Sequence, residues 1–177
     1  MRIPLPDPPL SEGVLRLRPW TVEEAPALVA AWADPEVARW TSVPRRCDEA
    51  FARHWIEGDE QRRAEGLSLD LVVDVGGQVV GEVGLSAIDA QAGRADIGWW
   101  IAADHRRQRY AVRAVRLLAD WAVEVELVDA LVARCHHENP ASSAVAERAG
   151  FVERPAGADG HRVWRFARLD RGGTLTP

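Results

Sequence analysis

A glycine pair between two apolar runs is the sequence feature that most limits how this chain can fold. Residues 67–75 and 78–86 are rich in valine and leucine, and Gly76 and Gly77 separate them. Two glycines in such a place are typical of a two-residue hairpin turn, because glycine adopts a positive φ without strain. The middle of the chain is therefore predicted to form two neighbouring antiparallel strands.

Helices and further strands are predicted on both sides of this hairpin. Thr21 to Glu24 has the sequence of a capping box, and apolar residues at helical spacing follow it. Asp34-Pro35 ends that helix, and a short turn follows. Further helices are expected from 48 to 65, from 107 to about 126, and from 139 to 150. Further strands are expected at 14–18, 95–101, 130–136, 151–154 and 162–169.

These elements predict one α/β (α+β) domain, in which helices pack on a mixed, mostly antiparallel sheet of six or seven strands. The length of 177 residues fits a single domain. We place this domain at residues 13–170. The proline-rich residues 1–12 are expected to form a loose arm, and residues 171–177 a frayed tail.

The composition excludes several classes of protein. The net charge of −5 argues against a dedicated nucleic-acid binder, although all 22 basic residues are arginine. The two cysteines, Cys47 and Cys135, are too few for a disulfide framework and lack metal-ligand spacing, so no metal site is predicted. No apolar run reaches the ~20 residues of a membrane span, and no secretory signal precedes the first strand. We expect a cytoplasmic protein with no membrane partner.

One basic segment is the strongest pointer to a ligand. Between residues 105 and 116 the chain has five arginines, one histidine and no acidic residue, at the point where a strand gives way to a helix. Cations at the start of a helix oppose its dipole, whereas an anion there is stabilised by the free amides. The segment therefore indicates a phosphate site, and the alternative is an exposed arginine-rich helix start.

The motifs around this segment occur in a familiar order. They are Ile97-Gly98-Trp99-Trp100-Ile101, the basic turn, Ala111 and Ala114 in the following helix, Asn139-Pro140-Ala141-Ser142, and Ala149-Gly150-Phe151. In this order and spacing the chain resembles the GNAT superfamily of acyl-CoA-dependent N-acyltransferases. The similarity is to the RimJ/RimL type, which includes enzymes that acetylate the N-termini of ribosomal proteins.

The resemblance implies acetyl-CoA, or another acyl-CoA, as co-substrate, with no metal. It implies that the strands at 95–101 and 130–136 run parallel and splay apart at their carboxyl ends. There the first of them pairs with the pantetheine arm, and the basic turn wraps the pyrophosphate. The implied cofactor-binding residues are Trp100, Ile101, Ala102, Arg106, Arg107, Gln108, Arg109, Tyr110, Ala111 and Asn139. This turn departs from the family pattern, because Arg107 and Arg109 stand where the family has glycine. Those glycines allow unusual backbone angles and a close approach of the pyrophosphate.

Amine acylation needs a base, because only the neutral amine attacks, and a proton donor for the leaving thiolate. Asp96 stands where this branch has an acidic residue before its Ile-Gly motif, and Glu82 lies on the neighbouring strand. Either carboxylate is a candidate base. The tyrosine that serves as the acid elsewhere in the superfamily is replaced by Ala146, so Ser142 is the candidate donor to the thiolate.

The resulting hypothesis is direct transfer of an acyl group from acyl-CoA to the amine of a small molecule or of a protein N-terminus. Two alternatives stay open because of the missing glycines. One is a non-catalytic binding module on the same fold. The other is an acyltransferase whose donor is a carrier protein or an aminoacyl-tRNA, the one nucleic acid that the interpretation allows as a partner. A homodimer is compatible with the sequence.

Overall fold

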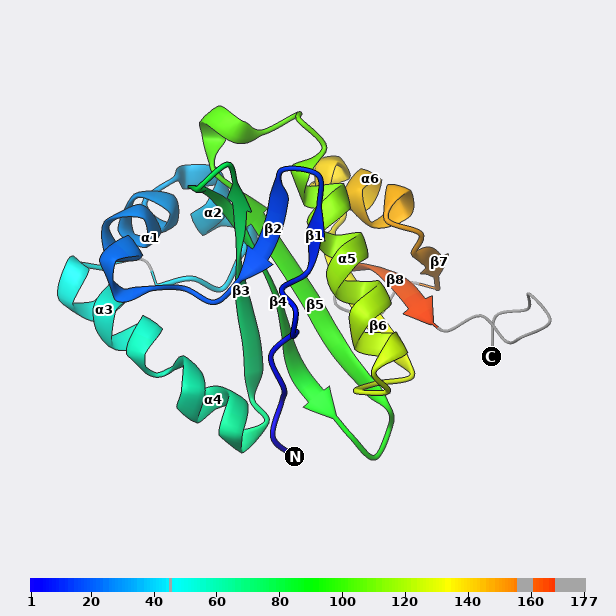
Figure 1. The fold of residues 1–177 in the computed structure, drawn as a ribbon. Coiled ribbons are helices and arrows are strands. Elements are labelled where there is room, and N and C mark those ends of the chain that lie inside the picture. The colour runs from blue at the N-terminus through cyan, green and yellow to red at the C-terminus, as the bar shows by residue number, and fades with distance from the viewer. Residues whose placement is uncertain (45, 156–160, 168–177) are drawn as a thin grey trace.

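Eight strands of the described residues form one twisted sheet. The structure is a computed structural model, and it describes residues 1–44, 46–155 and 161–167 (Figure 1). The strands are β1 (Ser11–Glu12), β2 (Leu15–Arg18), β3 (Ser68–Val75), β4 (Gln78–Asp89), β5 (Arg94–Ile101), β6 (Ala130–His136), β7 (Val152–Arg154) and β8 (His161–Ala167), in the sheet order β1-β2-β3-β4-β5-β6-β8-β7. The predicted mixed, mostly antiparallel α/β fold is confirmed, with eight strands rather than six or seven.

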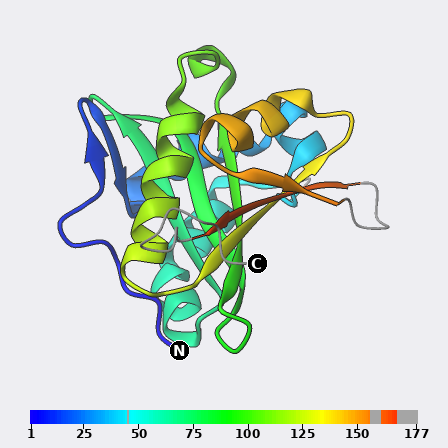
Figure 2. The ribbon, with the colours of Figure 1, turned by 90° about the vertical axis from the view of Figure 1, so that its right-hand side faces the viewer.

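Helices cover both faces of this sheet, as Figure 1 shows. The helices are α1 (Ala25–Trp32), α2 (Pro35–Trp40), α3 (Glu49–Glu57), α4 (Asp59–Glu65), α5 (Tyr110–Glu124) and α6 (Pro140–Arg148), with short 3₁₀ turns at Val22–Glu24 and Ala103–His105. The first four helices lie on one face, whereas α5 and α6 lie on the other (Figures 1 and 2). Within the described residues, no helix is long and apolar enough to cross a bilayer.

The alternation of side chains along the strands produces two separate cores. Leu69, Leu71 and Val73 of β3 point towards α5, and Leu118 and Ala122 of α5 are buried against this face. Val72, between them in sequence, points to the opposite face. There it joins a smaller core rich in tryptophan, which contains Trp20, Trp32 and Trp100 together with Leu28 and Ile56. Each face of the central strands is therefore covered by helices, and the sheet lies between these two helical layers.

The central hairpin has the form that its glycines predict. Gly76 and Gly77 have φ values of 61° and 87°, and β3 and β4 pair antiparallel on either side of them. The pairing shifts register after Val73. A Cβ on Gly81 would lie 2.4 Å from the carbonyl oxygen of Trp100, so the neighbouring backbone approaches closely at this position too.

Strands β5 and β6 pair for only three residues before they separate. Arg94, Ala95 and Asp96 pair in parallel with Ala130, Leu131 and Val132, and the pairing goes no further along either strand. The predicted parallel strands that splay at their carboxyl ends are thereby confirmed. The second half of β5 keeps its antiparallel partner β4 but has no partner on its β6 side. Its backbone groups there are left for another partner.

Two helices differ from the sequence prediction. Asp34-Pro35 ends α1 as expected, but it also begins the six-residue helix α2, where only a turn was predicted. Proline suits the first helical position, and the Asp34 carboxylate accepts hydrogen bonds from the Glu36 and Val37 amides. The helix predicted from 48 to 65 is divided at Gly58 into α3 and α4.

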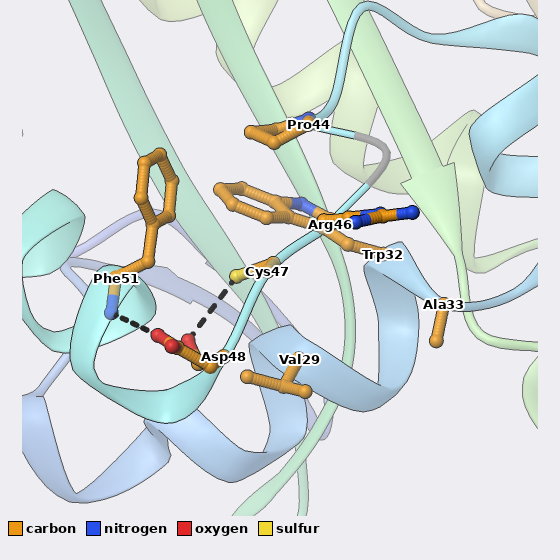
Figure 3. A pocket seen from close by; sticks show the side chains of 8 residues that line it. All are labelled: Val29, Trp32, Ala33, Pro44, Arg46, Cys47, Asp48 and Phe51. Atoms are coloured by element: carbon orange, nitrogen blue, oxygen red, sulfur yellow. Dashed lines mark hydrogen bonds between the residues drawn. The ribbon is translucent and has the colours of Figure 1, made fainter.

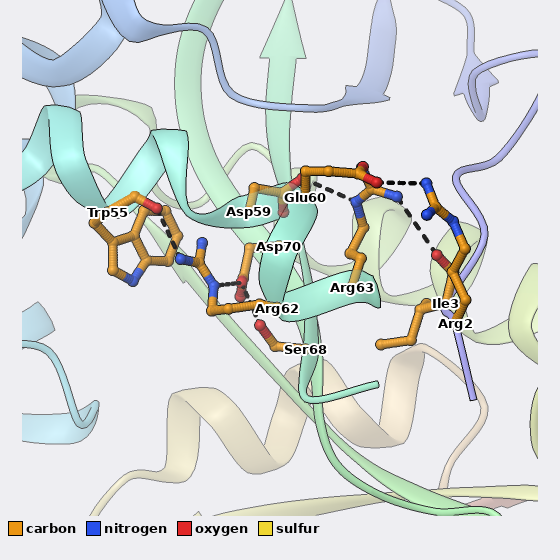
Figure 4. A network of polar contacts seen from close by, with 9 residues as sticks. All are labelled: Arg2, Ile3, Trp55, Asp59, Glu60, Arg62, Arg63, Ser68 and Asp70. Atoms are coloured by element: carbon orange, nitrogen blue, oxygen red, sulfur yellow. Dashed lines mark hydrogen bonds and ion pairs between the residues drawn. The ribbon is translucent and has the colours of Figure 1, made fainter. Parts of the chain in front are cut away.

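The first twelve residues are held against the domain, in contrast to the loose arm that their prolines suggest. Ile3 is fully buried, and its amide donates to the carbonyl of Arg63 on α4. Figure 4 shows the ion pairs around this contact, in which Arg63 binds both Asp59 and Glu60, and Arg2 also reaches Glu60. The last residues of this segment form the edge strand β1. The tail predicted at 171–177 lies outside the described residues.

Candidate active site

A cavity of about 590 Å³ opens beside the splayed end of β5. It lies between α2, the segment that leads from β5 into α5, and α6. Its wall consists of Glu36, Val37, Trp40, Thr41, Trp99, Trp100, Ile101, His105, Arg106, Arg107, Arg109, Tyr110, Ala111, Val112, Asn139, Ala141, Ser142, Ala144, Val145 and Arg148. Most of the predicted cofactor-binding residues are among them. Ala102 and Gln108 are not on the wall.

The turn before α5 has the backbone of a glycine-rich loop although arginines occupy it. Arg107 and Arg109 have φ values of 62° and 64°, in the left-handed region that glycine adopts freely. For other residues this conformation costs roughly 1–2 kcal/mol. These are the two positions where the sequence departs from the family's glycines. The turn therefore keeps its shape at an energetic cost, and both side chains are exposed at the mouth of the cavity.

The backbone amides at the start of α5 lie next to this turn. Arg109 is the residue before the first helical turn, and its side chain accepts no hydrogen bond from the helix. The first amides of a helix have no partner within it, and the helix dipole makes them attractive to an anion. This helix is 15 residues long and ends against the core, so the amides are fixed in direction. The turn and the helix start thus form a ready anion site.

Arg106 has a different place from its two neighbours. Its Nε donates to the carbonyl oxygen of Ile101 at 2.9 Å, and its Nη2 donates to Asp34 Oδ2 at 2.7 Å. The guanidinium therefore fastens the turn to β5 and to the junction between α1 and α2. Arg106 is therefore engaged with Ile101 and Asp34 and is not a free cation on the cavity wall.

Asn139 and Ser142 meet at the start of α6 on the opposite wall. The Asn139 carbonyl Oδ1 accepts a hydrogen bond of 3.1 Å from the Ser142 amide, so Asn139 caps the helix. Both residues face the cavity. The structure therefore brings the predicted thiolate donor to the wall that faces the end of β5.

Glu82 lies behind the wall rather than on it. Its two carboxylate oxygens accept hydrogen bonds from the indole groups of Trp20, at 2.8 Å, and Trp100, at 3.1 Å. Trp100 itself lines the cavity. Burial among protein atoms and the negative charge of Asp70 raise the pKa of Glu82 to about 8, against the effect of the two indoles. The residue as a whole keeps a small exposed fraction.

Asp96 lies away from the cavity. It is at the last paired position of β5 and β6, and its Oδ2 accepts a hydrogen bond of 3.0 Å from Arg134 Nε. Both side chains are partly exposed on the sheet face opposite α5. The three predicted catalytic residues are thus not brought together: Ser142 is on the wall, Glu82 is one hydrogen bond behind it, and Asp96 is outside.

Several wall residues were not among the predicted site residues. Trp40 is half-buried and lines the cavity, and Glu36 accepts a hydrogen bond of 2.9 Å from its indole. His105 and Arg148 also face the cavity. The sequence signal for Glu36 and Trp40 was the Asp34-Pro35 pair, which reads as a helix start as well as a helix end.

A second cavity, of about 460 Å³, lies between α1 and α3 and shares no residue with the first (Figure 3). It is lined by Val29, Trp32, Ala33, Pro44, Arg46, Cys47, Asp48 and Phe51. The Asp48 carboxylate accepts from the Phe51 amide, as the dashed line in Figure 3 shows, and so begins α3. Within the described residues, no group of histidines, cysteines or carboxylates could hold a metal ion.

Comparisons with known proteins agree on one family. The family model described as an acetyltransferase (GNAT) domain matches residues 15–152. An uncharacterised N-acetyltransferase of Bacillus licheniformis, p20, is 29% identical over 130 residues, which are 72% of this chain and 73% of that protein. The residues matched by the family model include all those that line the cavity.

Two solved structures show the same fold. A ribosomal L7/L12 α-N-protein acetyltransferase, RimL, in complex with coenzyme A has a TM-score of 0.76 and 20% identity, over 89% of this chain and 94% of that one. The microcin C7 self-immunity acetyltransferase MccE, in complex with acetyl-CoA and AMP, has a TM-score of 0.77 and 17% identity, with the same coverage of 89% and 94%.

Proposed function

This chain belongs to the GNAT acetyltransferase family, and from that premise we propose that its cavity binds acetyl-CoA and transfers the acetyl group to an amine. The observation that carries the proposal is the union of two features in one cavity. These are the unpaired half of β5 and the uncapped, arginine-rich start of α5. An extended chain that ends in a phosphate group fits both.

The donor is proposed to lie along the cavity from α5 towards α2. The amides at the start of α5 and the guanidinium groups of Arg107 and Arg109 bind its phosphates. The pantetheine arm runs between β5 and α6, where Trp100 and Ile101 supply the strand edge and Asn139 the opposite wall. Tyr110 and Ala111 close the side next to the helix. Coenzyme A and acetyl-CoA in the RimL and MccE structures support this choice of donor.

The chemistry proposed is direct transfer. The neutral amine attacks the carbonyl carbon of the thioester, the tetrahedral intermediate collapses, and the C–S bond breaks to release the CoA thiolate. Ser142 donates a hydrogen bond or proton to this thiolate. Glu82 takes the proton of the amine through a water molecule, because its pKa of about 8 suits a base near neutral pH. Asp96, held by Arg134, is the second candidate for that role.

The acceptor is proposed to be an amine of a small molecule or of a protein N-terminus. The protein that RimL is named for acting on, ribosomal L7/L12, supports the second class. The proposal places the reaction in the cytoplasm and allows a homodimer, which light scattering would measure. Donors such as a carrier protein or an aminoacyl-tRNA, and a non-catalytic role, are the competing proposals.

Calorimetric titration with acetyl-CoA tests the donor before any acceptor is known. We expect binding that weakens with added salt, because the phosphate contacts are charged and exposed. Arg109→Ala is expected to lower the affinity by roughly ten- to a hundredfold, because it loses one charge-assisted hydrogen bond of roughly 1.5–3 kcal/mol. Arg134→Ala, which removes a cation outside the cavity, is the matched control and leaves the affinity unchanged.

The opposite outcome is equally clear. If the wild type does not bind acetyl-CoA, but the double variant Arg107→Gly with Arg109→Gly does, the arginines block the site and the proposed donor is wrong. Where binding is found, release of the CoA thiol is then followed with a panel of amines. Thiol release that no amine accelerates would favour the non-catalytic role.

A further inference from the structure

We propose that Glu36 selects the acceptor by charge: the cavity takes an amine that arrives protonated, as an ammonium group, and binds it beside the Glu36 carboxylate. The proposal rests on the proposed acetyl-transfer function, and it goes further by naming the charge class of the acceptor and the residue that recognises it.

The distribution of charge on the cavity wall is the first argument. Among the described residues that line the cavity, Glu36 is the one carboxylate. The other ionisable groups on the wall are Tyr110 and the cationic or basic side chains of His105, Arg106, Arg107, Arg109 and Arg148. All of these belong to the turn, to α5 or to α6, where the phosphates of a CoA donor would lie. Glu36 comes from α2, so the wall has a basic side and a single acidic group on another element.

The second argument is that Glu36 is held in place without being neutralised. Its Oε2 accepts a hydrogen bond from the Trp40 indole, one helical turn further on, and indole carries no charge. The one cation of α2, Arg39, pairs with Glu138 at 3.5 Å and lies 4.3 Å from the centre of the Trp40 ring. The Glu36 carboxylate is therefore held by an uncharged donor, and the cation of its own helix is bound elsewhere.

The third argument is the anchoring of α2. Its first amides bind Asp34 Oδ1, and Asp34 Oδ2 binds Arg106. The helix that presents Glu36 is thereby fastened to the turn that would bind the donor. Glu36 is fixed and exposed, and no cation pairs with it within residues 1–44, 46–155 and 161–167. A carboxylate of this kind, in a wall of cations, is suited to an ammonium ligand. An anionic group would be repelled by it, and a neutral donor would gain less from it than an ammonium group.

Two amines of nearly equal shape test the proposal. Phenethylamine is an ammonium ion at neutral pH, whereas O-benzylhydroxylamine has an oxygen in place of one methylene and is neutral. Each is titrated calorimetrically into the protein already saturated with CoA, so the test needs no turnover. We expect the wild type to bind phenethylamine at least tenfold more tightly than O-benzylhydroxylamine.

Glu36→Gln is the decisive variant, because glutamine keeps an oxygen that accepts from the Trp40 indole and loses only the charge. It is expected to remove the tenfold preference while its affinity for CoA stays within twofold of the wild type. Glu57→Gln, an exposed carboxylate on α3 outside the cavity, is the matched control and keeps the preference.

The failures are distinguishable. If the wild type does not bind CoA, the proposed function fails, and this inference fails with it. If CoA binds but phenethylamine does not, or binds no better than O-benzylhydroxylamine, the inference alone is wrong. A preference that survives in Glu36→Gln also overturns it, and so does a variant that weakens both amines equally, since that would be the mark of a purely structural role.

Discussion

Two parts of the cavity wall are built by opposite means. At the start of α5 the backbone does the shaping: the turn at 106–109 is exposed, arginine-rich and left-handed at Arg107 and Arg109. At the end of β5 the side chains do it: the wall residue Trp100, together with Trp20, holds the enclosed Glu82 behind the wall through its indole. Amides of the main chain are available whatever the side chain is, so the turn tolerates substitutions that the Glu82 cluster would not.

The largest effect is expected at the Glu82 cluster. Glu82→Gln removes the proposed base and should lower turnover by roughly 10²–10⁴-fold. Affinity for acetyl-CoA should change little, because the donor's phosphates lie at the other part of the wall. Thiol release at saturating donor measures the first quantity and calorimetry the second.

Asp96→Asn is the companion variant, since it changes the other candidate base in the same way. Turnover that survives Glu82→Gln and falls in Asp96→Asn would transfer the role to Asp96. If both variants keep normal turnover, neither carboxylate is the base, and the chemical contrast between the two parts of the wall disappears.

A smaller effect is expected from Asp70. Burial raises the pKa of Glu82 first, and the negative charge of Asp70 raises it further. A base works in its deprotonated form. The value of kcat/KM should therefore rise with pH and level off above about 8. Asp70→Asn removes the second cause, and the midpoint of that rise should move to lower pH. A midpoint that stays or moves upward would contradict the coupling between these carboxylates.

The smallest effect is expected at the turn, and it concerns stability. Arg107→Gly and Arg109→Gly each relieve a left-handed backbone that costs roughly 1–2 kcal/mol, while glycine adds about 0.5–1 kcal/mol of unfolded-state entropy. Each variant should therefore be more stable by up to about 1 kcal/mol, measured by urea unfolding. Arg116→Gly, in the middle of α5, is the control and should lose about 1 kcal/mol. Equal losses at all three positions would show that the turn is unstrained.

Most of the fold could be predicted because its signals are local. Gly76-Gly77 and the alternation around it specify the central hairpin, and the motif order around residues 97 to 151 specifies the splayed strands and the helix start between them. The strand count was low because β1 has only two residues, Ser11 and Glu12, and no periodicity can be read from so short a segment.

The site was harder to predict than the fold. A sequence shows which strand or helix a residue belongs to more reliably than it shows which face of that element the side chain occupies. Glu82 and Asp96 are both on central strands, as predicted, but whether a carboxylate reaches the cavity depends on what packs over it. For Glu82 that is Trp100, and for Asp96 it is Arg134 from a strand 38 residues away. Glu36 was not predicted as a wall residue, because the Asp34-Pro35 pair was interpreted only as the end of a helix.

The Asp34 carboxylate binds two different elements, and this has a consequence for how each substrate affects the binding of the other. One oxygen of its carboxylate holds α2, and the other holds Arg106 of the turn. We expect a donor bound at the turn and an amine bound beside α2 to be coupled through this carboxylate. Coupling of this kind is reciprocal by thermodynamic necessity: whatever acetyl-CoA does to the affinity for the amine, the amine does equally to the affinity for acetyl-CoA.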